Sequence, residues 1–134
     1  MKQLILTLIL VILSAPVCFG EWTEVTKNVK GGVHYVDFGG ISQHSGYVFF
    51  GELVDYKPNV DGIVSTEVYT QADCDRFRYK TLSAFTYNQP MGKGDIIDIS
   101  DDLDRNWEDP QPDSIEEGIL KAVCDYVKNK KNKE

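Results

Sequence analysis

The residues that could carry nucleophilic catalysis in this chain are few. A serine, threonine or cysteine nucleophile needs a base within hydrogen-bond reach, and the 134-residue sequence has two histidines, His34 and His44. His34 lies in the middle of an expected strand, and His44 lies in a polar loop beside Ser42 and Ser45. We interpret the histidines as a strand surface residue and a loop residue. We therefore predict no catalytic residue and no enzymatic activity.

An acidic stretch, residues 95–117, could bind a metal ion. Within it Asp102, Asp104 and Asn106 alternate as in the first half of a calcium-binding loop, where oxygen ligands recur at this spacing. The sixth position is Trp107 instead of glycine, two prolines follow, and no helix is expected before the loop. We interpret the stretch as a solvated acidic loop and predict no metal site, with calcium binding as the alternative.

A short glycine-containing segment, Gly92-Lys93-Gly94, could suggest a phosphate-binding loop. It lacks the strand–loop–helix context of such loops, and no serine or threonine follows the lysine in the required position. We interpret it as a turn. No other motif suggests a nucleotide or prosthetic group, and we predict that the protein has no cofactor.

The N-terminal segment has the composition of a secretory signal peptide. A lysine near the start precedes an apolar run over residues 4–13, and Cys18 and Gly20 place small residues at −3 and −1 of a cut before Glu21. The run is shorter than the roughly 20 residues of a membrane-spanning helix. We predict that residues 1–20 are removed between Gly20 and Glu21. The alternative is a lipoprotein modified at Cys18, although the preceding residue is β-branched where a small one is expected.

The predicted mature chain is one domain over residues 21–127, followed by a flexible lysine-rich tail over 128–134. The net charge of −7 belongs to an acidic surface, which repels nucleic acid and anionic lipid. Neither is a predicted partner, and we expect no transmembrane segment in the mature chain. The signal peptide places the protein in the periplasm, on the outer-membrane surface or outside the cell.

Two cysteines remain after the predicted cleavage, Cys74 and Cys124. In an exported protein such a pair is expected to form a disulfide, with two buried free thiols as the alternative. A zinc site would need more ligands than these cysteines and two scattered histidines offer. By the loop-entropy model the disulfide would stabilise the fold by about 4 kcal/mol.

A helix is predicted over residues 113–128. Ser114 and Glu117 have the spacing of a capping box, in which the side chain of each residue accepts a hydrogen bond from the backbone N–H of the other. Apolar residues recur on one stripe: Ile115, Ile119, Leu120, Val123, Cys124 and Val127. Because Cys124 lies on this stripe, it faces the surface on which the helix packs.

The segments before the helix alternate apolar and polar residues and end at glycine- or proline-containing turns, as strands do. These segments are residues 22–27, 33–38, 47–57, 63–73, 75–88 and 95–100. The alternation slips once near Thr81–Ala84, which indicates a β-bulge. Strands followed by a helix predict an α+β fold, a five- to six-stranded antiparallel sheet with one C-terminal helix on one face, tethered by the disulfide. The other face is then a candidate for association or ligand contact.

Several short pieces along the chain follow in a family-specific order: Trp22, Tyr35-Val36-Asp37, Leu53-Val54-Asp55-Tyr56-Lys57, Asp73-Cys74, Thr86-Tyr87-Asn88, Met91-Gly92-Lys93-Gly94, Trp107, Pro112-Asp113-Ser114 and Cys124. Their order and spacing resemble the bacterial surface-adhesin protein E family across residues 21–127. The resemblance implies a six-stranded antiparallel sheet with its C-terminal helix held on the concave face by a disulfide.

The resemblance also implies an envelope or surface protein of a Gram-negative bacterium. The expected function is that of a non-enzymatic binding domain whose partner is a host matrix protein or an envelope protein. The alternative is a periplasmic structural or assembly accessory that never meets a host. No host-binding segment of the known adhesin can be placed on this sequence residue by residue, so the resemblance assigns the fold and disulfide but no ligand-binding residue. The oligomeric state is open.

Overall fold

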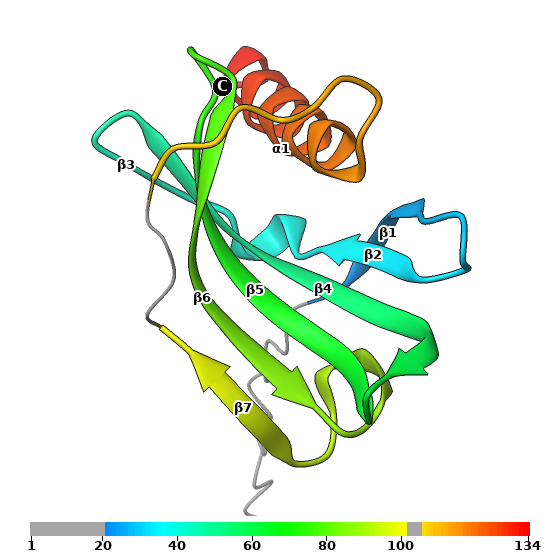
Figure 1. Cartoon of the computed structure of the whole chain (residues 1–134). Helices are drawn as coiled ribbons and strands as arrows, with labels where there is room; N and C mark the ends of the chain where they lie inside the picture. The colour runs from blue at the N-terminus through cyan, green and yellow to red at the C-terminus, as the bar shows by residue number, and fades with distance from the viewer. Residues whose placement is uncertain (1–20, 102–105) are drawn as a thin grey trace, which may run out of the picture.

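The alternating segments pair into one antiparallel sheet in the computed structural model, which describes residues 21–101 and 106–134 (Figure 1). The strands lie in the order β1-β2-β4-β5-β6-β7, and a further strand, β3, pairs with one end of β4. Their bounds are β1 Thr23–Lys27, β2 Val33–Val36, β3 Ser42–His44, β4 Tyr47–Val60, β5 Ile63–Asp73, β6 Arg78–Tyr87 and β7 Ile96–Ser100. The predicted α+β sheet is therefore confirmed.

The strand β3 lies where the sequence predicted a polar loop. Its residues pair with Tyr47, Val48 and Phe49 across a two-residue turn at Ser45 and Gly46, whose φ angles are 53° and 83°. Two consecutive positive φ values are typical of the turns that match the twist of a hairpin. The prediction of a loop at His44 was therefore wrong. The short strand has polar side chains and lacks the apolar alternation by which strands are recognised.

Two strand boundaries also differ from the prediction. Strand β4 continues to Val60 through an irregular register after Asp55, so the turn into β5 is only Asp61-Gly62, with φ values of 49° and 79°. Strand β6 begins at Arg78 because the four residues before it form a turn. The predicted bulge is confirmed, since the pairing of β5 with β6 shifts by one residue between Tyr69 and Thr70.

The single long helix, α1 (Ile115–Asn132), begins where the capping box predicted. The Glu117 backbone N–H donates to Ser114 Oγ at 3.1 Å, and Glu117 Oε1 accepts from the Asp113 backbone N–H at 3.2 Å. The helix ends at Asn132 and not near residue 128, so most of the predicted tail is helical. Lysine has a good helix propensity, and positive charge is favourable at a helix C-terminus, which together account for the extra turn.

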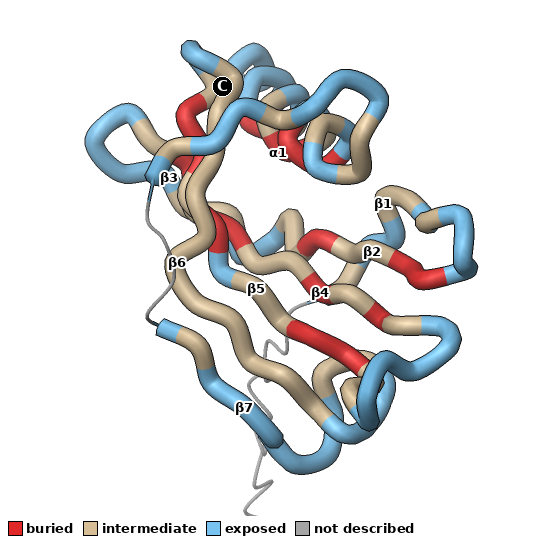
Figure 2. The backbone as a smooth tube through the Cα atoms, viewed as in Figure 1, coloured by how far each residue is buried: buried red, intermediate tan, exposed pale blue. Residues whose placement is uncertain are grey.

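The core lies between α1 and one face of the sheet (Figure 2). Four residues of the predicted stripe are buried against four from β2, β4 and β5: Ile119, Leu120, Val123 and Val127 pack with Val36, Val48, Phe50 and Ala72. Fully burying an apolar side chain of this size is worth about 1.5–3 kcal/mol. A disulfide joins Cys74, just after β5, to Cys124 of α1. The predicted packing and disulfide are both confirmed.

The opposite face, which we call the outer face, is covered at one end by the short 3-10 helix η2 (Pro90–Gly92). The Met91 backbone N–H donates to Asp55 Oδ1 at 2.7 Å, and the Gly92 backbone N–H donates to Ser65 Oγ at 2.9 Å. Gly92 has a φ of 66°, and a β-carbon there would lie 3.4 Å from Leu53. The Gly92-Lys93-Gly94 segment is therefore part of a turn that covers one end of the outer face. Another 3-10 helix, η1 (Phe38–Gly40), follows β2.

Candidate functional site

Large apolar side chains remain exposed on the outer face. The paired positions Phe85 and Ile99 share this face with Leu53, and Ile99 is 56% exposed. Tyr69 is 42% exposed and stacks on Phe49, with 6.4 Å between the ring centroids. Strand β7 ends the sheet, and its residues from Ile96 to Ile99 are exposed (Figure 2). The sequence predicted that one face would be left for association, and the exposed face is the one away from α1.

The two tryptophans border this face and have structural contacts. Trp107 stacks on Tyr47 at 5.4 Å between centroids, and the cationic ends of Arg78 and Lys80 each lie 4.6 Å from its ring centre. Such contacts hold the segment before α1 on the sheet. Trp22 lies over Gly51, where a β-carbon would come within 3.5 Å of the indole ring. The two tryptophans therefore lie at the border of the exposed apolar side chains of the outer face.

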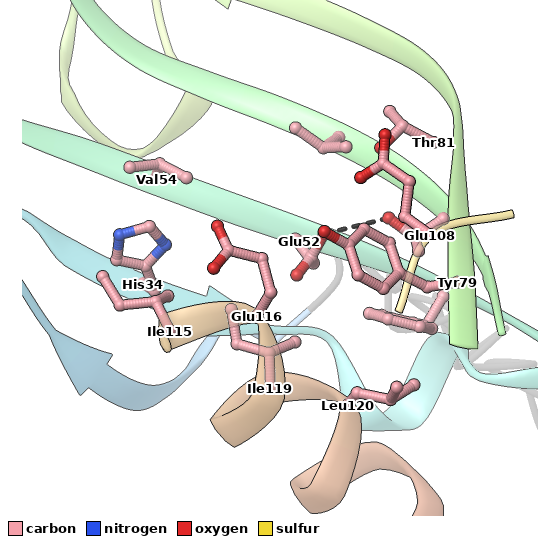
Figure 3. A pocket seen from close by; sticks show the side chains of 13 residues that line it. His34, Glu52, Val54, Tyr79, Thr81, Glu108, Ile115, Glu116, Ile119 and Leu120 are labelled. Carbon is pink, nitrogen blue, oxygen red and sulfur yellow. Dashed lines mark hydrogen bonds between the residues drawn. The ribbon is translucent and has the colours of Figure 1, made fainter. Parts of the chain in front are cut away.

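A second feature is a cavity of about 220 Å³ between the first turns of α1 and the sheet, which we call the acidic cavity (Figure 3). Its polar groups come from six segments of the chain: His34 of β2, Glu52 of β4, Thr70 of β5, Tyr79 and Thr81 of β6, Glu108, and Glu116 of α1. Apolar side chains, including Phe50 and Ile119, line the rest. The backbone of Glu108 is fixed by two hydrogen bonds with Tyr79, of 2.8 and 3.0 Å.

Glu52 is the most perturbed group of the acidic cavity. The pKa of its carboxyl group is raised to about 7, mainly by burial; a hydrogen bond of 2.9 Å from Thr70 Oγ1 opposes the rise, and the charge of Glu116 adds to it. Burial also raises the pKa of Tyr79, and contact with Glu108 adds to this rise. Burial lowers the pKa of His34, against the attraction of Glu116. The cavity thus combines a desolvated carboxyl group with further negative charge.

Sequence reasoning did not identify the acidic cavity, although one signal was available. On the helix-facing side of β4 the alternation runs through Phe50, Glu52 and Val54, so an acid occupies a position where an apolar residue is expected. His34, predicted to be a strand surface residue, instead lines this cavity. The other wall residues come from separate strands and the helix. Only the three-dimensional structure brings them together.

The structure does not assemble a nucleophile and a base from the described residues. Neither His34 nor His44 hydrogen-bonds a hydroxyl or thiol group there, and His44 contacts Phe49 with a centroid distance of 5.9 Å. The sulfur atoms of Cys74 and Cys124 are bonded to each other. Within residues 21–101 and 106–134, no three acidic, histidine or cysteine side chains are grouped to hold a metal ion.

Some predicted positions fall outside the described residues. These are Asp102 and Asp104 of the calcium-like pattern, and Gly20 on one side of the predicted cleavage site. Asn106 and Glu21 are described, and Glu21 is the first residue of the described chain. In the part of the chain that the structure covers, no helix has the length and apolar composition needed to cross a bilayer.

Comparison with known proteins identifies a family and several solved structures that are similar to this chain. The family model of surface-adhesin protein E matches residues 22–125. Among solved structures, Haemophilus influenzae protein E is similar with a TM-score of 0.62 and 18% sequence identity, covering 84% of this chain and 89% of that one. Its crystal form II gives a TM-score of 0.59 at 18% identity, covering 83% and 92%. No curated protein matches the sequence. The chain belongs to the surface-adhesin protein E family.

Proposed function

We propose that this chain is an exported, non-enzymatic binding domain that holds a protein partner on the outer face of its sheet. The observation that carries the proposal is the exposure of large apolar side chains around Tyr69 and Ile99. Exposed apolar patches with polar borders are typical of protein interaction sites. Membership of a surface-adhesin family supports export and protein binding. The partner that we propose is a host matrix protein or another envelope protein.

The shape of the patch suits a flat protein surface. A shallow hollow of about 280 Å³ lies between Tyr69, Phe85 and Ile96, and it can receive an apolar side chain from a partner. Among the described strands β7 pairs only with β6, so no described strand pairs with its other edge. Free strand edges accept an extended segment of a partner by backbone hydrogen bonding. Apolar contact and strand addition are therefore available side by side.

A binding measurement on matched variants tests this proposal. The purified protein is passed over immobilised extracellular-matrix proteins and over purified outer-membrane proteins, and binding is followed by surface plasmon resonance. We expect Ile99→Lys and Tyr69→Lys to weaken the recovered interaction at least tenfold. Val60→Lys is the control, because Val60 is 51% exposed at the far hairpin, away from the patch. Equal binding by all four proteins would exclude the outer face as the contact surface.

Export and location are tested separately. Mass spectrometry of protein taken from the envelope should find Glu21 as the first residue, and a lipid on Cys18 would contradict soluble release. Protease added to intact cells should digest a surface-exposed protein. A protein that is fully protected until the outer membrane is opened would favour the periplasmic accessory function over adhesion.

A further inference from the structure

The acidic cavity contains charged groups that take no part in the proposed binding at the outer face. The carboxylates of Glu52, Glu108 and Glu116 come from β4, the segment before α1 and the first turn of α1, and all three line the same space (Figure 3). Both salt bridges between described residues lie elsewhere, at Lys27–Glu24 and Arg78–Asp73. No described lysine or arginine therefore neutralises this negative charge.

Glu52 is the anchor of this arrangement. Its carboxyl group is enclosed by the sheet and α1, and where it is accessible it faces the cavity. Thr70 Oγ1 donates to Oε2 at 2.9 Å, and Oε1 has no hydrogen-bond partner among the described residues. Glu52 is only partly exposed, and a carboxylate that has lost much of its contact with water and has a single donor is costly. A bound cation would supply the missing counter-charge.

The surroundings of Glu52 favour an organic cation over a metal ion. No three potential ligands among the described residues are grouped closely enough for a metal, so the carboxylates are spread around the wall. Between them lie the apolar side chains of Phe50, Ile115, Ile119 and Leu120. A volume of about 220 Å³ lies below the typical range of pockets for drug-sized ligands. These features together suit a few carbon atoms carrying one positive charge.

We propose that the acidic cavity binds a small alkylammonium group, with the ammonium group against Glu52 and the alkyl part against Phe50, Ile115 and Ile119. The negative net charge of the protein raises the local concentration of cations near the entrance. The Tyr79 side chain forms part of the wall beside Glu52. The group can belong to a free amine or to a lysine side chain of a peptide.

Binding depends on the ionisation of Glu52. The titratable groups that face it are His34 from β2, Tyr79 from β6, Glu108 from the segment before α1, and Glu116 from α1. Because burial holds the Glu52 pKa at about 7, lowering the pH removes its negative charge and weakens the attraction for a cation. Binding at neutral pH should therefore release a proton from part of the molecules.

The experiment is an NMR titration of the isotope-labelled mature protein with butylammonium chloride at pH 8, with 1-butanol as the neutral probe of similar shape. We expect saturable shift changes at Glu52, Glu116 and Ile119, at least tenfold weaker binding of butanol, and several-fold weaker butylammonium binding at pH 5.5. Capped lysine, Nα-acetyl-lysine methylamide, distinguishes the two sources, since its binding requires an entrance open to a peptide.

Variants of matched charge complete the test. Glu52→Gln should weaken butylammonium binding at least tenfold, and Asp98→Asn, which removes an exposed acid from β7, should bind as the unmodified protein does. Glu116→Gln lies on an exposed helix position and is expected to fold and bind several-fold more weakly. Equal affinities for butylammonium and butanol, or unchanged binding by both glutamine variants, would overturn the proposal. Displacement of butylammonium by equimolar calcium would also overturn it, because an inorganic cation would then be the better ligand.

Discussion

Cys74 and Cys124 join the end of β5 to the middle of α1, with 5.6 Å between their Cα atoms. The covalent link therefore holds α1 beyond its first two turns. The N-terminal end of α1, which covers the acidic cavity, is held by the packing of Ile115 and Ile119 and by the attachment of the preceding segment at Glu108. The two ends of the helix are thus held by different kinds of interaction.

Removing the disulfide should destabilise the domain without changing its fold. The change Cys124→Ser, made together with Cys74→Ser to avoid a free thiol, should lower the free energy of unfolding by about 2–5 kcal/mol. Domains of this kind have a total stability of about 5–15 kcal/mol, so the melting temperature should fall markedly. Hydrogen exchange should increase first over residues 114–127. An unchanged melting temperature, or two free thiols in protein from the envelope, would contradict this prediction.

A buried charge on α1 should be more harmful than the same charge one residue away. Ile119 is 4% exposed, and Ile119→Asp loses its apolar contacts and places a carboxylate in the core. We expect a loss of more than about 3 kcal/mol with the disulfide intact, measured by urea unfolding. Gly118→Asp is the control, since Gly118 faces open space near the helix N-terminus. Its stability should change by less than about 1 kcal/mol, and equal losses would contradict the packing of α1.

Glu52 should make the stability depend on pH. Its pKa is about 7 in the folded protein and 4.5 as the ordinary value, so the folded state binds a proton that the unfolded state releases between these pH values. Stability should then decrease as the pH rises from about 4.5 to 7, by an amount on the order of 3 kcal/mol.

Urea unfolding at pH 5 and pH 8 measures this dependence. Glu52→Gln should remove this part of the decrease, and Asp98→Asn should retain it. A glutamine variant with the same pH dependence as the unmodified protein would show that Glu52 ionises normally.

A glycine in α1 offers a stabilising substitution. Gly118 lies in the second turn, and a β-carbon there would meet no atom within 4 Å. Gly118→Ala should raise the free energy of unfolding by about 0.5–1 kcal/mol, because alanine loses less conformational entropy in a helix. Gly92→Ala should have the opposite effect, since Gly92 has a φ of 66° and lies against Leu53. Chemical denaturation of the two variants measures both, and a gain at Gly92 would contradict the described turn.

Elements with strong local signals were predictable from the sequence. Helix α1 has a capping box at Ser114 and Glu117 and an apolar stripe, and both features act within a few residues. The bulge in β6 was visible because a slip in alternation changes which side chains are apolar. The disulfide followed from the number of cysteines and the expected export. The helix and the bulge depend on interactions within a few residues of the same element. The disulfide could be predicted from the number of cysteines alone.

Other features depend on contacts between distant segments. Strand β3 is polar, and it forms because β4 supplies hydrogen-bond partners for Ser42–His44. The acidic cavity depends on the register that places Glu52 opposite Val36 on one side and Val68 on the other. The end of α1 at Asn132 was not predictable, because a lysine-rich segment is equally common in helices and in flexible tails. Local patterns carry no information about these neighbours.

The position of α1 after all the described strands has a consequence for folding during the export that we propose. A chain that crosses a membrane N-terminus first delivers all strands before the helix. The sheet can pair while Val36, Val48 and Phe50 still face water, because α1 is the element that covers them. Cys74 must likewise remain reduced or bind another thiol until Cys124 arrives. With the export that we propose, the domain would be completed only after translocation, and until then the helix-facing side of the sheet would be open to a chaperone.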